Sequence, residues 1–228
     1  RFDNKRTVNC KLLMIVDNFT KFDKKRIMKR ILLFGALSMS LIGSAQLTQG
    51  TEAMIGEMRS MYLCDSFTVN QSGVVGPAVT WDFTGIASYT GETRDVVVSD
   101  ATTSPNAADF PGSTYALSVG TMLTTYYSTS ATDKISQGFV FNEPSLGDVI
   151  AKFSTDAETV VTYPFAYGSS LSDGFSGDLD YVLGGPQTSP LTGMAYAWID
   201  GEGTLNLPGA VTLTNVIRYK IIDTSWAT

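Results

Sequence analysis

The sequence predicts an all-β fold, an antiparallel β-sandwich of the jelly-roll or immunoglobulin type, with a signal-peptide helix at the N-terminus. From Phe67 onward, Thr, Val, Tyr and Phe dominate short runs that Gly, Pro, Asp, Asn and Ser interrupt. Apolar and polar residues alternate at 195–199 and 204–207, which places the apolar side chains on one face of a half-buried strand. Long amphipathic helices do not separate these runs, and this disfavours an α/β fold.

The expected strands follow one another at short spacing, as in a sandwich or barrel. In chain order they are Val79–Phe83, Arg94–Ser99, Tyr115–Val119, Leu123–Ser128, Ile135–Phe141, Val149–Phe153, Thr159–Phe165, Asp178–Leu183, Met194–Ile199, Gly203–Leu207 and Val211–Ile222. Tight turns are expected at 119–121, 136–138 and 208–209. One helix is expected within 46–63, where good helix formers surround Gly56.

Residues 28–46 read as a bacterial secretory signal followed by its cleavage site. Two basic residues precede an uncharged apolar run at 31–42, and small residues at 43–45 indicate cleavage after Ala45. The apolar run is shorter than the roughly 20 residues that a membrane-spanning helix needs. We therefore expect a secreted or cell-surface protein that contacts the membrane only through this cleavable segment.

The signal divides the chain into three parts. Residues 1–27 precede a complete signal that has its own Met, and we interpret them as an upstream extension that is not native; a basic targeting arm is the alternative. Residues 46–228 are enough for a single β-rich domain. The last residues are still strand-like, so we expect the protein to continue past Thr228.

Charge and cysteine content narrow the possible partners. Residues 1–45 carry ten basic and three acidic residues, whereas residues 46–228 carry six basic and nineteen acidic residues, a net charge of −13. Such a surface repels phosphate backbones and anionic lipid, so we do not expect a nucleic-acid partner. After the cleavage site only Cys64 remains, and we interpret it as a small buried apolar residue and not as a reactive thiol.

The sequence contains no histidine, which excludes Ser-His-Asp and Cys-His catalysis and His-ligated metals. No phosphate-binding glycine loop is present. We therefore assign no catalytic residue and expect no cofactor other than calcium. The favoured function is a binding or structural module without catalysis, whose partner is a glycan or a surface protein. The alternative is a carbohydrate-active protein.

Three groups of residues are candidate sites. The first is a calcium site at Asp173, Asp178 and Asp180, because carboxylates among glycines suit a hard cation; the alternative is that these acids face water in turns. The second is Asp200 with Glu202, a carboxylate pair of the kind that glycoside hydrolysis uses; a hairpin or bulge built on the adjacent glycines is the alternative.

The third group consists of aromatic residues that suit glycan stacking: Trp81, Tyr196 and Trp198. Their alternative role is core packing, because all three lie in expected strands. In the first of these strands Trp81 and Phe83 are expected to share a face, with Asp82 outward. We also expect Arg218 to pair with a carboxylate, either Asp82 or Asp200.

Three segments carry a resemblance to a known group of proteins. They are VTWDFTG at 79–85, DGEGTLNLPG at 200–209 and NVIRYK at 215–220. The chain from residue 46 resembles the N-terminal β-rich region of secreted Bacteroidota proteins that commonly carry a C-terminal sorting domain for type IX secretion. The resemblance implies export and a surface or extracellular location, and it implies no catalytic residue. The sorting domain itself is not within the 228 residues.

Overall fold

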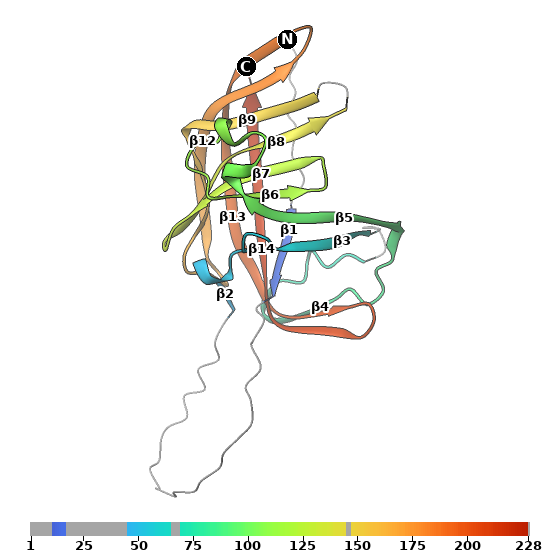
Figure 1. The fold of residues 1–228 in the computed structure, drawn as a ribbon. Coiled ribbons are helices and arrows are strands. Elements are labelled where there is room, and N and C mark those ends of the chain that lie inside the picture. Colours follow the sequence, from blue (N-terminus) through green and yellow to red (C-terminus); the bar gives the residue numbers. More distant parts are fainter. Residues whose placement is uncertain (1–10, 17–44, 65–68, 145–146, 228) are drawn as a thin grey trace, which may run out of the picture.

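The computed structural model describes residues 11–16, 45–64, 69–144 and 147–227. These residues are almost entirely β-structure (Figure 1). The strands are β1 (Lys11–Val16), β2 (Gln46–Leu47), β3 (Met58–Cys64), β4 (Gly76–Asp82), β5 (Ser88–Asp100), β6 (Tyr115–Val119), β7 (Leu123–Thr129), β8 (Asp133–Glu143), β9 (Gly147–Asp156), β10 (Glu158–Thr162), β11 (Phe165–Ala166), β12 (Ser170–Val182), β13 (Pro186–Leu207) and β14 (Val211–Ala227). Three 3₁₀ turns, η1 (Gln49–Thr51), η2 (Ala101–Thr103) and η3 (Ala107–Asp109), complete the described elements.

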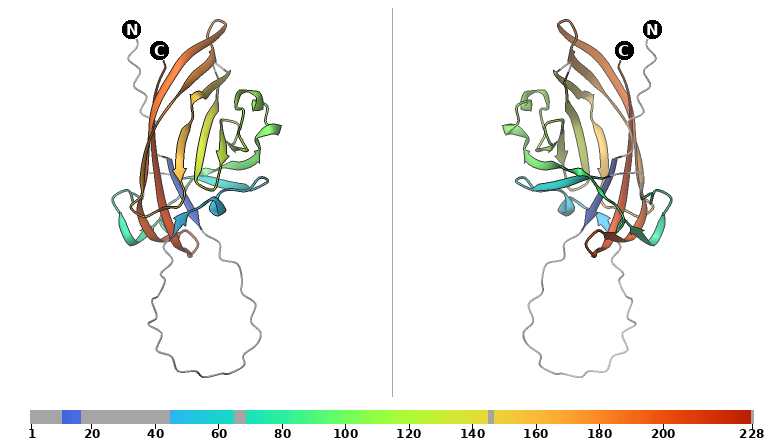
Figure 2. Two further views of the ribbon diagram at one scale, coloured as in Figure 1. Left: turned by 90° about the vertical axis from the view of Figure 1, so that its left-hand side faces the viewer. Right: turned by 90° about the vertical axis from the view of Figure 1, so that its right-hand side faces the viewer.

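Within the described residues, twelve strands form one sheet in the order β1-β14-β13-β12-β9-β8-β7-β6-β5-β3, with β10 beside β8 and β4 beside β13. The sheet folds back on itself, so that the long strands β12–β14 form one layer and β6–β9 lie across from them (Figure 2). The prediction of an all-β sandwich is confirmed, and its pairings are antiparallel except that β4 pairs in parallel with β13, which makes the sheet a mixed one. Most neighbours in the sheet also follow each other in the chain, as in a meander, whereas jelly rolls and immunoglobulin domains use Greek-key connections.

The core lies between the two layers and is built from alternating strand residues. Phe153 of β9 packs on Phe175 of β12 with ring centroids 4.5 Å apart, beside the buried Leu191 and Ala195 of β13. A second part of the same interior joins β10 to β13 and β14 through Val160, Val161, Ala197, Ile199, Ile217 and Tyr219. The face of each strand that carries these residues is the inner face, and the opposite face points outward.

The segment after residue 45 is held at several points to this interior. Leu47 is buried in the core, and β2 pairs with β11. Five residues later the carboxylate of Glu52 accepts hydrogen bonds from Lys134 Nζ at 2.8 Å, Tyr115 Oη at 3.1 Å and Tyr163 Oη. Burial, and next the charge of Glu52, raise the pKa of Tyr115, so its hydroxyl stays a donor.

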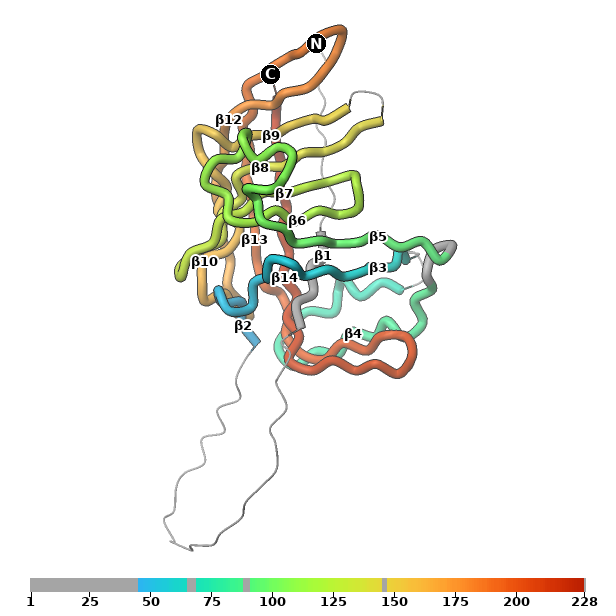
Figure 3. The backbone as a smooth tube through the Cα atoms, in the orientation of Figure 1, coloured from blue at the N-terminus to red at the C-terminus, as the bar shows by residue number. Residues whose placement is uncertain are grey.

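Residues 69–86 cover the outer face of the lower β13–β14 hairpin (Figure 3). Strand β4 pairs in parallel with β13, with Val79 opposite Gly203. Trp81 is fully buried there against Leu205 and Val216, and its Nε1 donates to the carbonyl of Val74 at 2.9 Å. Phe83 packs on the same cluster, whereas Asp82 is exposed, which confirms the expected alternation.

Several local expectations differ from the structure. Residues 46–63 contain η1 and part of β3 instead of a longer helix, because hydrogen bonding of Met58–Cys64 to β5 outweighs weak helical propensity. Cys64 is exposed and not buried, because β3 is an edge strand. The expected turn at 136–138 lies inside β8, where a Cβ on Gly138 would stand 2.0 Å from the Ala151 carbonyl oxygen; this glycine permits close strand approach.

The turns at 119–121 and 208–209 are confirmed, the latter as the link between β13 and β14. The expected strands at 194–199 and 203–207 are parts of the single long strand β13. Residues 17–44, which include most of the expected signal peptide, lie outside the described residues. Strand β1, within the expected upstream extension, pairs antiparallel with residues 216–221 of β14. Within the described ranges, no helix has the length and apolar character required to span a bilayer.

Candidate binding surface

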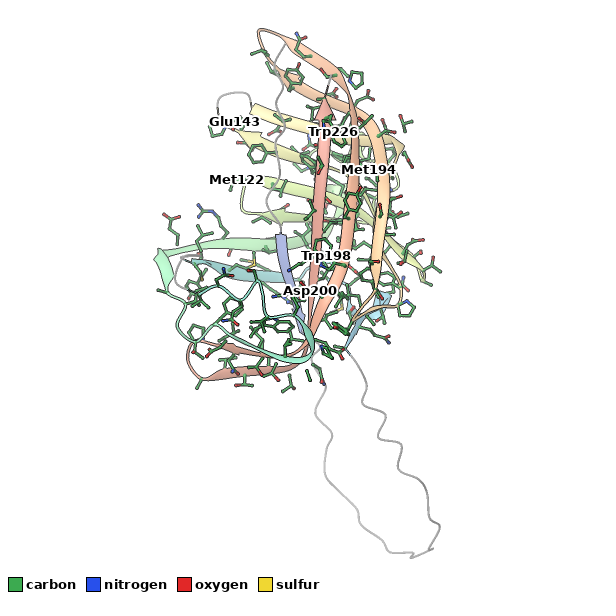
Figure 4. All side chains as sticks on the ribbon, turned by 180° about the vertical axis from the view of Figure 1, so that it is seen from behind. Met122, Glu143, Met194, Trp198, Asp200 and Trp226 are labelled. Carbon is green, nitrogen blue, oxygen red and sulfur yellow. The ribbon has the colours of Figure 1, made fainter. Side chains whose placement is uncertain are left out.

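The outer face of β12–β14 carries a row of partly exposed apolar side chains that the covering segment 69–86 leaves open (Figure 4). On β13, Tyr196 and Trp198 alternate with the fully buried Ala197 and Ile199, so the two rings share the outer face. Tyr196 remains 48% exposed and Trp198 is half-buried. We call the outer-facing Met194, Tyr196, Trp198, Ile222 and Trp226 the aromatic platform.

The pairing of β13 with β14 defines the width of the platform. Ile222 lies opposite Tyr196, and Trp226 lies opposite Thr192 near the far end of the row, where it is 43% exposed. Directly opposite residues of antiparallel strands share a face, so Trp226 extends the same surface along the strands. Figure 4 shows Trp226, Met194 and Trp198 following one another along the two strands.

On the other side of β13, strand β12 contributes only small residues to this face. Ser170, Ser172 and Gly174 lie opposite Trp198, Tyr196 and Met194, respectively. A Cβ on Gly174 would stand 3.5 Å from Met194 Sδ, so the methionine lies over the glycine. Small neighbours leave the aromatic faces uncovered, and the two serine hydroxyls place hydrogen-bonding groups along their border. The arrangement suits a ligand with a flat apolar face and a polar rim.

The lower end of the platform is fixed by an ion-pair cluster. Asp200 accepts from Arg218 through two donors and from Lys220 Nζ at 2.5 Å. Burial opposes ionisation of Asp200, but its hydrogen bonds to Arg218 and Lys220 outweigh burial and lower the pKa of this carboxyl. Lys220 Nζ also lies 6.0 Å from the centre of the Trp198 ring. The cluster therefore holds Lys220 beside the indole and limits the positions open to Trp198.

Of the three predicted stacking residues, the structure brings together two and separates the third. Tyr196 and Trp198 are neighbours on the platform, whereas Trp81 is fully buried beneath residues 69–86, with the Arg218 guanidinium 5.4 Å from its ring centre. Trp81 cannot stack on a ligand, and its role is core packing. Its burial explains why Gly201 is a glycine, because a Cβ there would stand 2.6 Å from the indole.

Asp200 and Glu202 do not face each other. Asp200 is on the side of Arg218, whereas Glu202 lies opposite Ile217, a residue of the inner core. Opposite residues share a face, so the two carboxylates point to different sides of the sheet. Glycoside hydrolysis requires two carboxyl groups that flank one bond, and this pair lacks that arrangement. The register shift between Ile199 and Gly201 confirms the alternative, a β-bulge at the glycines.

The three aspartates proposed for calcium lie on strand β12 and not in a loop. Asp178 and Asp180 share the outer face. Asp178 accepts a hydrogen bond from Ser154, and Asp180 accepts hydrogen bonds from Lys152 and Thr188. Asp173 has the opposite parity in the strand, and it accepts from the Thr159 amide at 2.6 Å. Across the described ranges, no group of three or more His, Cys, Asp or Glu is arranged to hold a metal ion. Calcium binding stays a prediction.

Arg218 pairs with Asp200, which confirms one of its two predicted partners. Met194, Ile222 and Trp226 were not predicted as site residues. Met194 alternates with the buried Gly193 and Ala195, whereas the neighbours of Ile222 and Trp226 are only partly buried or exposed, so burial alternation does not identify these two residues. Whether the outer face is open also depends on where residues 69–86 lie.

No family model matches the sequence, and no curated protein or solved structure is significantly similar to it.

Proposed function

We propose that this chain is an exported, cell-surface or extracellular binding module without catalysis, and that its aromatic platform binds an extended glycan. A glycan offers the two features that the platform complements. The C–H faces of sugar rings are apolar and stack on aromatic rings, while their hydroxyls require hydrogen-bonding partners at the border of the contact.

The observation that carries this proposal is the combination of partly exposed aromatic rings with small polar neighbours on one face of the sheet. Tyr196 and Trp198 lie on successive outward positions of β13, so their α-carbons are about 6.7 Å apart by strand geometry. Ser170 and Ser172 lie directly beside them on β12. Trp226 extends the surface toward the far end, which gives an elongated contact and favours a chain of sugars over a single ring.

Charge and chemistry favour a neutral glycan over the other large partners. The acidic balance of residues 46–228 disfavours nucleic acid and anionic membranes. An exposed apolar patch also serves protein contacts, but those usually bury a wider surface than a single row of side chains bordered by serines. Localisation outside the cell would place the platform where polysaccharides occur, and the signal-like segment at 28–45 supports this part of the proposal.

The test is retention on polysaccharides. The protein is incubated with cellulose, chitin and xylan, and soluble glucans and mannans are cast into native gels to detect slowed migration. The protein should be retained by at least one of these polymers. Tyr196→Ala and Trp198→Ala should each weaken that binding about tenfold, a loss of ~1.4 kcal/mol.

The matched control is Tyr62→Ala, which removes an aromatic ring that is 66% exposed on β3, away from the platform. This variant should bind like the wild type. The proposal is wrong if no polymer retains the protein, or if Tyr62→Ala weakens binding as much as the platform variants do. Circular dichroism of each variant establishes that a loss of binding is not a loss of fold.

A further inference from the structure

An open cavity of about 380 Å³ lies on the outer face of the other layer, between strands β5–β9 and the loop that carries η2 and η3. Figure 2 shows this loop on the side of the sandwich away from β13 and β14. The cavity is therefore separate from the aromatic platform. Its lining residues are Ser99, Thr103, Ser104, Pro105, Asn106, Ser118, Thr121, Thr124, Tyr126, Val140, Asn142 and Asp148.

The loop that forms one wall is held in place by its own contacts. Asp100 accepts from the amide and the hydroxyl of Thr102, at 2.9 and 2.7 Å, and so caps the start of η2. At the far end of the loop, Phe110 is buried and stacks on Tyr126 with ring centroids 4.0 Å apart. Both ends are thus anchored to the sheet, and the cavity is formed before any ligand arrives.

Most residues that line the cavity carry a polar group, and their carbon atoms supply apolar surface beside it. Ser118 and Thr124 are joined by a hydrogen bond of 2.9 Å across β6 and β7, and Asn142 donates to Asp148 at 2.8 Å. A hydroxyl has one donor and two acceptor positions, so these bonds leave the groups able to bind a ligand as well. Ten of the twelve lining residues carry such polar groups, while Val140 and Pro105 supply apolar contacts.

The charge of the lining restricts the class of ligand. Among the described residues that line the cavity, Asp148 is the one charged side chain, and none is a Lys or Arg that would neutralise a phosphate or a carboxylate. A single carboxylate is also too little for a calcium ion, which takes six to eight oxygens and usually several charges. A neutral ligand rich in hydroxyls fits both the polarity and the size, because ligand cavities span about 300–1,000 Å³.

We infer that this cavity is a second binding site, specific for one neutral, hydroxyl-rich ring such as a monosaccharide or the end unit of a glycan. The site is independent of the aromatic platform, since the two lie on opposite outer faces of the sandwich. A protein with both sites binds a sugar ring at one face and an extended chain at the other.

The test uses glucose, galactose, mannose, fucose, N-acetylglucosamine and myo-inositol, each titrated into the isotope-labelled protein. Backbone amide shifts are followed by NMR up to about 20 mM sugar, which detects dissociation constants in the millimolar range. At least one sugar should shift the amides of Thr121, Thr124 and Asn142 in a saturable way. Thr121→Trp, which places an indole at the exposed rim, should abolish these shifts by filling the cavity.

Thr124→Val removes a hydroxyl at constant shape and should weaken the same binding at least about fivefold, whereas Thr129→Val, on the same strand but outside the cavity, should leave it unchanged. Trp198→Ala should also leave it unchanged, which separates this site from the platform. The inference is overturned if none of the six sugars shifts these amides, or if Thr121→Trp binds as well as the wild type. If Trp198→Ala loses polysaccharide binding but keeps the sugar-induced amide shifts at the cavity, the platform and the cavity are two independent binding sites.

Discussion

Arg218 holds Asp200 through two parallel donors, with Nε 2.6 Å from Oδ1 and Nη2 3.0 Å from Oδ2. The same guanidinium donates to the backbone carbonyls of Gln71 at 2.8 Å and Ser72 at 3.3 Å. Only 2% of Arg218 is exposed. One buried cation therefore ties β13, β14 and the covering segment 69–86 together, at the boundary between the covered and the open part of the outer face.

Asp200→Ala should be strongly destabilising. It would leave the buried charge of Arg218 with the carbonyls of Gln71 and Ser72 and the Trp81 ring but without a carboxylate partner, and removing one member of a buried pair costs about 3–5 kcal/mol. Urea unfolding followed by circular dichroism measures this loss. The control is Glu92→Ala, which breaks the pair with Arg94, whose two side chains are largely exposed; its cost should be about 0–1 kcal/mol. Equal losses in the two variants would contradict a special role for the buried pair.

The same carboxylate predicts how stability depends on pH. The folded-state pKa of Asp200 is lowered, because its bonds to Arg218 and Lys220 outweigh burial. A carboxyl with a lowered pKa contributes stability above its unfolded pKa, about 3.9, and this contribution is lost as pH falls through the folded value. The wild type should exceed Asp200→Asn in unfolding free energy by a constant amount at neutral pH, and the difference should shrink below about pH 4. A difference that instead shrinks toward alkaline pH would contradict the assignment.

Substitution of Gly203 tests whether the close approach of β4 to β13 requires a glycine at this position. Gly203 has φ +157°, and an added Cβ would stand 1.9 Å from the Val79 carbonyl oxygen. Gly203→Ala should force β4 away from β13 and cost about 3 kcal/mol, the upper part of the usual range for overpacking. Gly209, in the hairpin turn with φ +77°, has no atom within 4 Å of the position of a Cβ. Gly209→Ala should therefore show only the cost of a left-handed residue, about 1 kcal/mol. Thermal unfolding of the two variants gives the comparison, and a smaller loss for Gly203→Ala would be the contrary result.

Trp81 and Trp198 show which part of the candidate site the sequence could predict. Both lie in alternating strands, and alternation correctly predicts that each ring points to one face with its i+2 neighbour. Alternation does not reveal whether that face is covered. Trp81 is buried and Trp198 is not, because the segment 69–86 folds over the lower part of β13–β14 through a parallel pairing between residues far apart in the chain.

The positions of the strands could be predicted from the sequence better than the openness of a sheet face, since every expected strand overlaps one in the structure. The predicted strand boundaries and turns were wrong where a glycine forms a β-bulge or permits close approach of two strands, and does not reverse the chain. At Asp200–Gly203 the glycines form bulges inside one long strand, and at Gly138 the glycine permits close strand approach. Both patterns also occur in turns, so local sequence cannot distinguish a bulge from a chain reversal. Likewise, Met58–Cys64 forms a strand because it pairs with β5, and the helical propensity of the segment contains no information about this pairing.

The secretory signal expected from the sequence predicts a cut after Ala45, and the structure of the segment that follows is compatible with this cut. Strand β2 begins at Gln46, and Leu47 is buried in the core, so a cut after Ala45 would keep the anchoring contacts of Leu47 and Glu52. Mass spectrometry of the exported protein should therefore give a chain that starts at Gln46. Ala45→Leu should prevent processing, because the residue before the cut must be small.

The matched control is Ala36→Leu, the same exchange within the apolar run, which preserves the hydrophobicity that export requires and should be processed normally. The product would also lack β1, so residues 216–221 of β14 would become an open edge in the cleaved protein. Amide exchange at these residues should then be faster in the cleaved chain than in the uncleaved Ala45→Leu chain. Cleavage of both variants at the same rate, or a product that starts downstream of Leu47, would show that the processing site is not at Ala45.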